Sequence, residues 1–384
     1  MIILIKHARI FAPEDLGARD VVILGERIVA IGEDLTKWAD IEGTQIIEGK
    51  GFYLVPGFVD AHVHILGGGG AAGFGSRGPE MTFSEAALAG TTTVLGCVGA
   101  DQIGRDLWGL LAKTKSLEFR GMTAKMLTGG FDWRITLTDS IIKDIFAIDN
   151  VIGAKVAISD RRSFHPTQDE LNRVVADTMH GSLLSGKAGV LQVHVGDLDS
   201  GITPLIRAVK ETGVPIKHIW PTHFNRNELL MEQALDWTRM GGTVDLTPSI
   251  APPNFKRGTF STKALKKFLA AGVPIDQITV STDGGGVSTI HGFDKVERFP
   301  LDLLYKEFRE LVQTEGLAVA DALKVTSSNV ARMMKLERKG VVAEGADADL
   351  IMLDPETLKI KLVIVRGKVA VRNGKIMLTQ KLDV

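Results

Sequence analysis

The chain has 384 residues, of which 45% are hydrophobic and 24% are charged. That composition is typical of a globular protein with one large domain, or a large and a small one, and excludes a disordered or fibrous chain. The 45 basic and 46 acidic side chains nearly cancel and form no Lys/Arg-rich block. This argues against nucleic acid or a membrane as a partner and favours a small-molecule ligand.

The first residues and the cysteine content bear on the compartment. The apolar start "MIILI" is interrupted at once by Lys6 and His7, too early for a signal peptide or a membrane-spanning helix. A single cysteine, Cys97, rules out an internal disulfide and fits a reducing cytoplasm, so we expect a cytoplasmic protein. Because "TTTVLGCVG" reads as a buried strand, we expect Cys97 to be a core residue rather than a nucleophile.

Both ends of the chain contain short β-rich runs separated by Gly, Glu and Asp turns, a pattern typical of short strands. These β-rich stretches cover residues 1–11, 18–33, 44–57, 346–354 and 359–377. Because two β-rich ends flank a different middle, we predict a small β domain built from residues 1–56 and 337–384.

The middle, residues 57–336, alternates apolar β-branched runs with amphipathic helical stretches, several of which end in glycine. The eight predicted strands lie at 58–65, 91–98, 123–130, 151–159, 189–197, 217–224, 242–250 and 277–286. Near-continuous apolar strands in eight β/α units predict a parallel (β/α)8 TIM barrel. No "GxGxxG" follows the first strand, which argues against a dinucleotide-binding fold. A further helix is expected over 318–336.

Polar side chains occupy the carboxyl ends of the predicted barrel strands, where such barrels place their chemistry. His62 and His64 close the first strand with both imidazoles on one face, because residues i and i+2 of a strand point the same way. Four other strands contribute Lys155, His194, His223 and Asp283. Neutral imidazole and carboxylate suit zinc, with cobalt, manganese or nickel as alternatives. The set therefore predicts a metal site.

Each of these residues taken alone has a structural alternative. A single buried histidine is more often a hydrogen-bonded core residue than a ligand, and Asp283 could belong to a turn. Their coincidence at strand ends favours the metal. For the remaining histidines we expect structural or surface roles: His7, His165, His180, His218 and His291. His291 is the first exception to consider, because it follows the eighth strand.

Lys155 lies within an otherwise apolar strand. An ammonium group among metal ligands would repel the metals and cost free energy to desolvate. A neutral amine could instead react with carbon dioxide and give a carbamate, whose two oxygens can bridge two metals. The alternative is a salt bridge to a nearby carboxylate, which the apolar flanks "VIGA" and "VAIS" do not favour.

The predicted ligands and the motifs around them resemble those of a known enzyme family. "GFVDAHVH", followed by the strand-end Lys, His, His and Asp, resembles the amidohydrolase superfamily, and more closely the bacterial isoaspartyl (β-aspartyl) dipeptidases. The closer likeness rests on "HVHILGGGG", "LLAKTKSL", "MLTGG", "VIGAKVAISD", "PTHFNRN", "EQAL", "GGT" and "STDGGG", in this order and over nearly the whole chain. The resemblance implies a metal-dependent hydrolase on a barrel with a β-sandwich flank, two divalent ions with zinc first, and a homo-oligomer such as an octamer.

The resemblance also implies a role for each predicted ligand. One metal would be held by His62, His64 and Asp283, the other by His194 and His223, with carboxylated Lys155 as the bridge. A hydroxide between the metals would attack the amide carbonyl, while Asp283 accepts its proton and delivers it to the leaving amine.

Substrate contacts follow from the same resemblance. Arg162 and Arg226 would hold substrate carboxylates, for which a bidentate guanidinium is suited; the alternative for both is surface ion pairing. The backbone of Gly69 would contact the substrate, within a four-glycine loop that lets a ligand come close.

Four positions depart from the family's pattern, and all belong to the predicted substrate-binding shell. Ala71 stands where the family has a glutamate that binds the substrate's α-amino group, and Ala100 where it has a threonine. Phe131 replaces a tyrosine whose hydroxyl steadies the oxyanion, and Val287, next to Ser288, replaces a serine. A substrate without a free α-ammonium, such as an N-acylated β-aspartyl amide, would suit Ala71 better.

The sequence thus predicts a binuclear metal-dependent amide hydrolase for β-aspartyl dipeptides or a related carboxylate-bearing amide. Two alternatives stay open: another amidohydrolase, such as a cyclic amide hydrolase or deaminase, and a non-catalytic assembly protein. A deaminase usually uses one metal and no bridging lysine, and non-catalytic relatives generally lose metal ligands. A metal content near two per chain would therefore disfavour a deaminase, and the presence of all six ligands argues against a non-catalytic protein.

Overall fold

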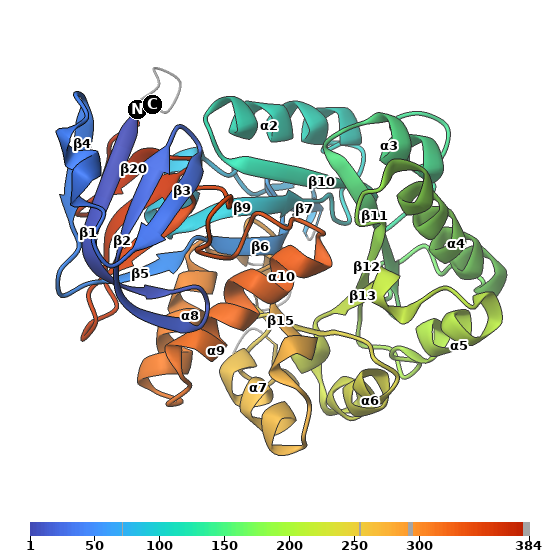
Figure 1. The fold of residues 1–384 in the computed structure, drawn as a ribbon. Helices are drawn as coiled ribbons and strands as arrows, with labels where there is room; N and C mark the ends of the chain where they lie inside the picture. The colour runs from blue at the N-terminus through green and yellow to red at the C-terminus, as the bar shows by residue number, and fades with distance from the viewer. Residues whose placement is uncertain (71, 253–254, 291–294, 379–384) are drawn as a thin grey trace.

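Strands from both ends of the chain form one sheet, which lies beside a helix-covered parallel sheet (Figure 1). The structure is a computed structural model, and it describes all residues except 71, 253–254, 291–294 and 379–384. No helix of the described part is long and apolar enough to cross a membrane.

All eight strands predicted for the middle of the chain are present, and all their pairings are parallel. Six form a curled sheet: β6 (Phe58–Val63), β9 (Thr91–Gly96), β10 (Thr123–Gly129), β11 (Val151–Ile158), β12 (Val190–Val195) and β13 (Ile219–Thr222). The other two, β14 (Val244–Leu246) and β15 (Ile278–Val280), pair with each other. A bridge between Val63 and Gly284 brings the ends of β6 and β15 together.

Helices follow the strands and cover the outside of the parallel sheet (Figure 1). They are α1 (Phe83–Leu88), α2 (Leu107–Phe119), α3 (Ile141–Ala147), α4 (Gln168–Ser185), α5 (Thr203–Thr212), α6 (Glu228–Arg239), α7 (Ser261–Ala270) and α8 (Leu303–Gln313). α4 shows how the sequence sets their limits: Thr167 and Glu170 form a capping box, and Gly186 ends the helix at a φ of 72°.

The helical stretch predicted over 318–336 is present as three consecutive pieces: α9 (Val319–Leu323), a π-helical turn at Lys324–Ser328 and α10 (Asn329–Met333). Ser327 in the π-helical turn donates to the Gly57 carbonyl at 2.7 Å. This contact fixes the end of the helical region against the start of β6.

The predicted pairing of the two chain ends is confirmed, whereas the predicted sandwich is not. The ends form a single nine-stranded sheet, built from β1 (Ile2–Phe11), β2 (Asp15–Leu24), β3 (Arg27–Gly32), β4 (Thr44–Glu48), β5 (Tyr53–Pro56), β18 (Leu350–Leu353), β19 (Ile360–Val365), β20 (Lys368–Arg372) and β21 (Lys375–Ile376). The two ends join where β5 pairs antiparallel with β18. β1 pairs with β4 along its first half and with β5 near its end.

Two short hairpins were not expected from the sequence. β7 (Gly69–Gly70) pairs with β8 (Gly73–Arg77), and β16 (Val287–Ile290) pairs with β17 (Lys295–Arg298). Short 3-10 turns complete the elements, at Thr36–Asp40, Ile216–His218, Phe224–Arg226 and Ile275–Gln277. The hairpins follow β6 and β15, so they flank the carboxyl ends of the first and last parallel strands.

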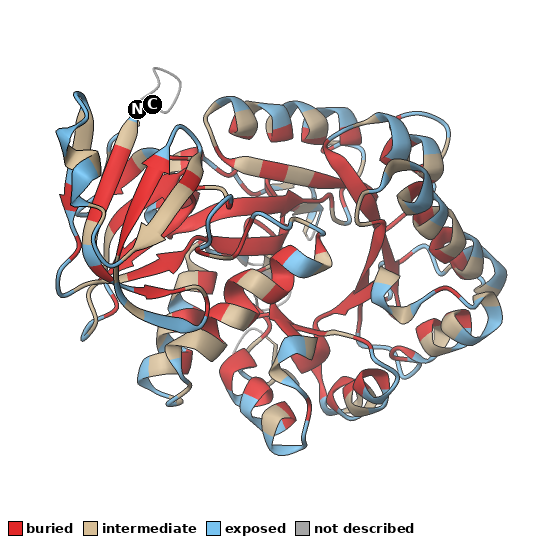
Figure 2. Cartoon of the chain, in the orientation of Figure 1, coloured by how far each residue is buried: buried red, intermediate tan, exposed pale blue. Residues whose placement is uncertain are grey.

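Burial explains why the strands of the middle region read as continuous apolar runs. Every residue of β6, β9, β11 and β12 is buried, as expected for a parallel sheet covered on both faces. Figure 2 shows the strands largely buried and the outer faces of the helices exposed. Polar side chains within such strands therefore need partners or a function.

A buried ion pair after α10 generates a stability prediction. Lys339 Nζ lies 2.5 Å from Asp349 Oδ2 and 2.7 Å from Asp347 Oδ2. Lys339→Met leaves the Asp349 carboxylate buried without its cation, which costs about 3–5 kcal/mol. We expect that loss in the free energy of unfolding measured with urea. Lys266→Met, at a half-exposed pair with Glu315, should cost about 1 kcal/mol or less; equal losses in the two variants would contradict this account.

Candidate metal centre

His62 and His64 lie at the end of β6 and face one carboxylate. The side-chain atom Asp283 Oδ1 is 2.9 Å from His64 Nε2 and 3.4 Å from His62 Nε2. The two imidazole rings are 5.5 Å apart. The predicted i, i+2 geometry therefore places both rings and Asp283 around one point.

A second histidine pair lies beside the first. His194 Nδ1, from β12, is 3.0 Å from His223 Nε2, which follows β13. The ring of His223 is also 5.3 Å from that of His62. The structure thus brings the four predicted histidine ligands and Asp283 together.

The backbone is strained where two of these ligands sit. His223 has a φ of 73° and Asp283 a φ of 56°, a left-handed region that residues other than glycine seldom adopt. Such strain concentrates at functional sites because the surrounding structure must hold it in place. Here it turns each side chain into the centre at the point where its strand ends.

Lys155 lies at the middle of β11 and is completely buried. Its Nζ is 2.8 Å from His62 Nε2 and 2.9 Å from Cys97 Sγ. No carboxylate of the described residues lies within 4.0 Å of this Nζ, so the salt bridge considered as the alternative is not found. The amine instead faces the histidine cluster.

Burial controls the protonation of the four imidazoles. It lowers the pKa of His62 and His223 far below the usual value, lowers that of His64, and lowers that of His194 to about 4. Burial would raise the pKa of Asp283, but the facing His64 outweighs it and the net shift is downward. At neutral pH the centre therefore holds neutral imidazoles and a carboxylate, the forms that bind metals.

An outer layer of polar groups fixes the second histidine pair. Asp160 Oδ2 lies 2.9 Å from His194 Nε2, and the Thr247 hydroxyl lies 2.9 Å from His223 Nδ1. Each partner occupies the ring nitrogen that points away from the other histidine. Carboxylate and hydroxyl partners of this kind set the tautomer and orientation of metal-binding imidazoles.

Two buried aspartates link neighbouring strand ends through hydrogen bonds. Asp60 accepts hydrogen bonds from the Thr282 amide and hydroxyl, next to Asp283. Asp245 accepts hydroxyl bonds from Thr222, Thr279 and Ser281. Burial raises the pKa of Asp60 to about 6 and that of Asp245 to about 7. These bonds join β6, β13, β14 and β15 below the centre.

The four-glycine loop packs against protein backbone. A Cβ on Gly68 would stand 2.7 Å from the Val287 nitrogen, and one on Gly67 would stand 2.4 Å from the Gly78 carbonyl oxygen. At Gly67 and Gly68, neighbouring loops therefore occupy the space that was predicted to admit a ligand. Gly69 instead faces the side chain of Asp101.

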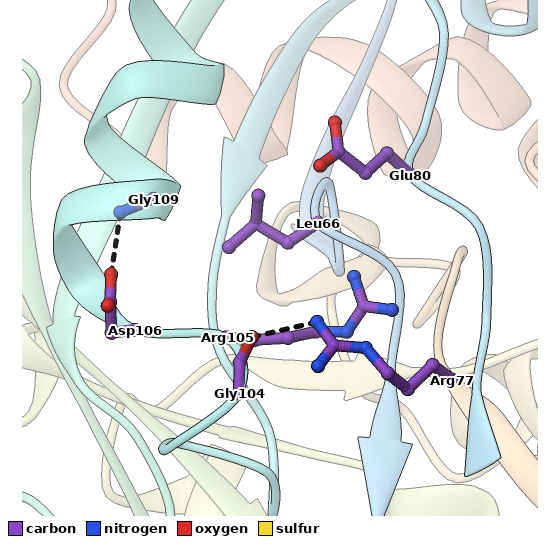
Figure 3. A pocket seen from close by; sticks show the side chains of 7 residues that line it. All are labelled: Leu66, Arg77, Glu80, Gly104, Arg105, Asp106 and Gly109. Carbon is purple, nitrogen blue, oxygen red and sulfur yellow. Dashed lines mark hydrogen bonds between the residues drawn. The ribbon is translucent and has the colours of Figure 1, made fainter. Parts of the chain in front are cut away.

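Two arginines tie this loop region to the start of α2. Arg77 donates to the Gly104 carbonyl at 2.8 Å (Figure 3), and Arg105 donates to the Gly78 carbonyl at 2.6 Å. They line a cavity of about 190 Å³ together with Leu66, Glu80, Gly104, Asp106 and Gly109. The reciprocal bonds hold the loop that follows His64 in position.

The predicted substrate-binding arginines lie on either side of the second histidine pair. Arg162 makes a bidentate contact with Asp160, with its Nε and Nη2 3.0 and 2.8 Å from the carboxylate oxygens. Arg226 is buried, and its Nε lies 3.2 Å from Asp197 Oδ1. Each therefore has, among the described residues, the ion pair considered as its alternative.

The four departures differ in how they face the centre. Phe131 packs between Arg162 and His194, 5.4 Å from the guanidinium carbon and 4.6 Å from the imidazole ring. Ala100 is exposed, and Val287 and Ser288, at the start of β16, are half-buried. Ala71 lies outside the described residues.

Sequence reasoning missed several residues of the centre. Cys97 is buried, as predicted, but its sulfur faces Lys155 and the histidines rather than apolar neighbours alone. Asp160 and Thr247 were not considered, although each follows a strand directly, the signal that had identified the histidines. Asp101, whose side chain faces Gly69, was also not considered.

The other described histidines are not among the side chains that meet at the centre. His7, His165 and His180 are exposed, and His218 Nδ1 is 2.9 Å from the Gly189 carbonyl. His291, the exception to consider, lies outside the described residues.

The donor set fits divalent metal ions. Asp283 Oδ1 is buried without a hydrogen bond although two imidazoles face it, and the facing nitrogens of His194 and His223 need a proton or a cation between them. His62, His64 and Cys97 also have ligand atoms within 4.8 Å of one another. Imidazole, carboxylate and thiolate together are the ligand chemistry of zinc.

Comparison with known proteins agrees with this geometry. The amidohydrolase family model matches residues 53–370. The β-aspartyl dipeptidase of Fervidobacterium islandicum AW-1, solved also in complex with β-Asp-Leu, is 38% identical, with a TM-score of 0.90 and 98% of each chain covered. The imidazolonepropionase of Anaeromyxobacter sp. (strain K) is 23% identical over 95% of this chain and 92% of its own length. The adenine deaminase of Bacillus velezensis is 24% identical over 98% of this chain, which spans only 58% of that protein.

The role of Asp160 can be tested against a matched aspartate. Asp160→Asn removes the charge that orients His194, so we expect about 10- to 100-fold weaker binding of a divalent metal, measured by competition with a chromophoric chelator. Asp132 binds Arg134 through the same i, i+2 bidentate contact, and Asp132→Asn should leave metal affinity unchanged. Equal affinity in the two variants would exclude the orienting role.

Proposed function

The chain belongs to the amidohydrolase family, and from that premise we propose that it is a binuclear metal-dependent amide hydrolase acting on β-aspartyl or related carboxylate-bearing amides. The likeness to the β-aspartyl dipeptidase of F. islandicum confirms the resemblance predicted from the sequence. The observation that carries the proposal is the convergence of four neutral imidazoles, Asp283 and Lys155 at the strand ends.

Two metals would be held by the predicted ligands. His62, His64 and Asp283 would bind one ion, His194 and His223 the other, and carboxylated Lys155 would bridge them, with zinc as the first candidate. When bound, the ions would lower the pKa of a water molecule between them and polarise the amide carbonyl.

The chain's own residues would complete the hydrolysis. The water oxygen bonds to the carbonyl carbon, and the Asp283 carboxylate accepts a proton from that water. The carbon–nitrogen bond then breaks, and Asp283 delivers the proton to the leaving amine. The position of Asp283 supports this role, because its carboxylate faces both His62 and His64 at the proposed metal site.

Substrate carboxylates would lie between the two arginines. Arg162 and Arg226 keep guanidinium N–H groups free of their aspartate partners, and a guanidinium suits a carboxylate. Phe131 packs against both Arg162 and His194, so it would form an apolar wall beside the scissile amide. The backbone of Gly69 and the side chain of Ser288 would contact the substrate from the first and last loops.

The remaining predictions are part of the same proposal. We infer that the two parallel sheets belong to one (β/α)8 barrel over residues 57–336, and that residues 1–56 and 337–384 form the flanking β domain. A cytoplasmic homo-oligomer such as an octamer is the assembly expected from the family resemblance.

Substrate preference tests the function. With Ala71 in place of an acid, we expect kcat/KM for N-acetyl-β-Asp-Leu to exceed that for β-Asp-Leu by about tenfold or more, because a substrate ammonium would lose its partner. Ala71→Glu should reverse the preference, and Ala72→Glu serves as the adjacent control. Hydrolysis of neither amide by the metal-loaded protein would contradict the proposed function.

A restored phenol hydroxyl tests the oxyanion argument. Phe131→Tyr should raise kcat for the preferred amide about 10- to 100-fold, because a missing oxyanion donor commonly costs a factor of that order. KM should change little if the hydroxyl acts only in the transition state. Phe119→Tyr, at an exposed position on α2, is the control. A rise in neither kcat nor kcat/KM would show that Phe131 does not face the reacting carbonyl.

A further inference from the structure

We propose that Cys97 is a ligand of the metal held by His62 and His64, so that the centre contains a sulfur donor as well as nitrogen and oxygen donors. The inference rests on the proposed metal site and adds to its ligands a residue that the sequence pattern assigned to the core.

The backbone places Cys97 beside the two histidines. Its amide donates to the Val63 carbonyl at 3.0 Å, and Cys97 directly follows β9, whose last residue Gly96 pairs with Val63, the residue between His62 and His64. The ligand atoms of all three residues lie within 4.8 Å of one another. In a tetrahedral zinc site, with bonds of about 2.0–2.3 Å, neighbouring ligand atoms are about 3.3–3.7 Å apart. Small side-chain rotations would bring the three onto one ion.

The Lys155 amine already contacts two members of this set. Lys155 Nζ lies between Cys97 Sγ at 2.9 Å and His62 Nε2 at 2.8 Å. A purely structural thiol could have packed its sulfur only against apolar neighbours such as Leu95 and Leu127, which share its cluster. The sulfur instead meets the buried Lys155 amine of β11, a polar group that also contacts His62.

Sulfur ligation would change the charge and the selectivity of the centre. On binding, a metal–sulfur bond forms, the sulfur–hydrogen bond breaks and the proton leaves to solvent. The thiolate would then add a second negative charge to that of Asp283 at this ion, beside His62, His64 and the bridging Lys155 carbamate. A thiolate favours zinc or cobalt over manganese or magnesium, which prefer oxygen ligands.

X-ray absorption at the zinc edge tests this directly on the zinc-loaded protein. We expect a sulfur shell at about 2.3 Å beside nitrogen and oxygen at about 2.0–2.1 Å. Cys97→Val, which preserves an apolar side chain of similar size, should lose that shell and bind zinc at least about tenfold more weakly in chelator competition. The packing control is Val98→Ala, at the adjacent buried position, which should keep both the shell and the affinity.

Failure of this inference is distinguishable from failure of the proposed function. Two zinc ions and amide hydrolysis without a sulfur shell would overturn the role of Cys97 and leave the hydrolase intact. A protein that binds no zinc would overturn both. If Cys97→Val does not fold, the spectrum of the unaltered protein decides alone, because Cys97 is the only cysteine in the chain.

Discussion

The centre depends on one electrostatic constraint: several metal-binding groups are buried together where little water can solvate them. Burial keeps the four imidazoles neutral, so each carries a lone pair. The close approach of His194 and His223 is favourable only with a proton or a cation between their nitrogens. Asp283 faces two further imidazoles without a hydrogen bond. Divalent ions would satisfy both arrangements at once.

Polar groups around the buried histidines hold their rings in one orientation. Asp160 serves His194 and Arg162 with the same carboxylate, which couples the position of a metal ligand to that of a substrate-binding arginine. Burial would raise the pKa of Asp160, but these two partners outweigh it and hold the pKa below its usual range. Asp160 therefore links the candidate metal centre to the side of Arg162 on which Phe131 packs.

The sequence was most informative where local pattern and tertiary environment agree. Parallel strands are buried on both faces, so their apolar runs could be recognised, and the histidines stood out within them. Asp160 could not be assigned in the same way, because an aspartate after a strand is common in turns. Its role appears only once His194 is seen beside it.

Two features of the structure could not be read from local sequence, for the same physical reason. Cys97 reads as a core residue in the strand, and it is buried, but burial does not say which way a side chain faces. The strands at the two chain ends were recognised, yet their joining into one nine-stranded sheet depends on pairings between β5 and β18, some 300 residues apart. Local sequence carries little information about either.

The central claim, a two-metal centre at these strand ends, is tested most directly by anomalous diffraction at the zinc edge from crystals grown with zinc. We expect two peaks about 3.5–4 Å apart, one beside His62, His64 and Asp283 and the other between His194 and His223. A single peak, or none, with the unmodified Lys155 amine between the histidines, would contradict the account.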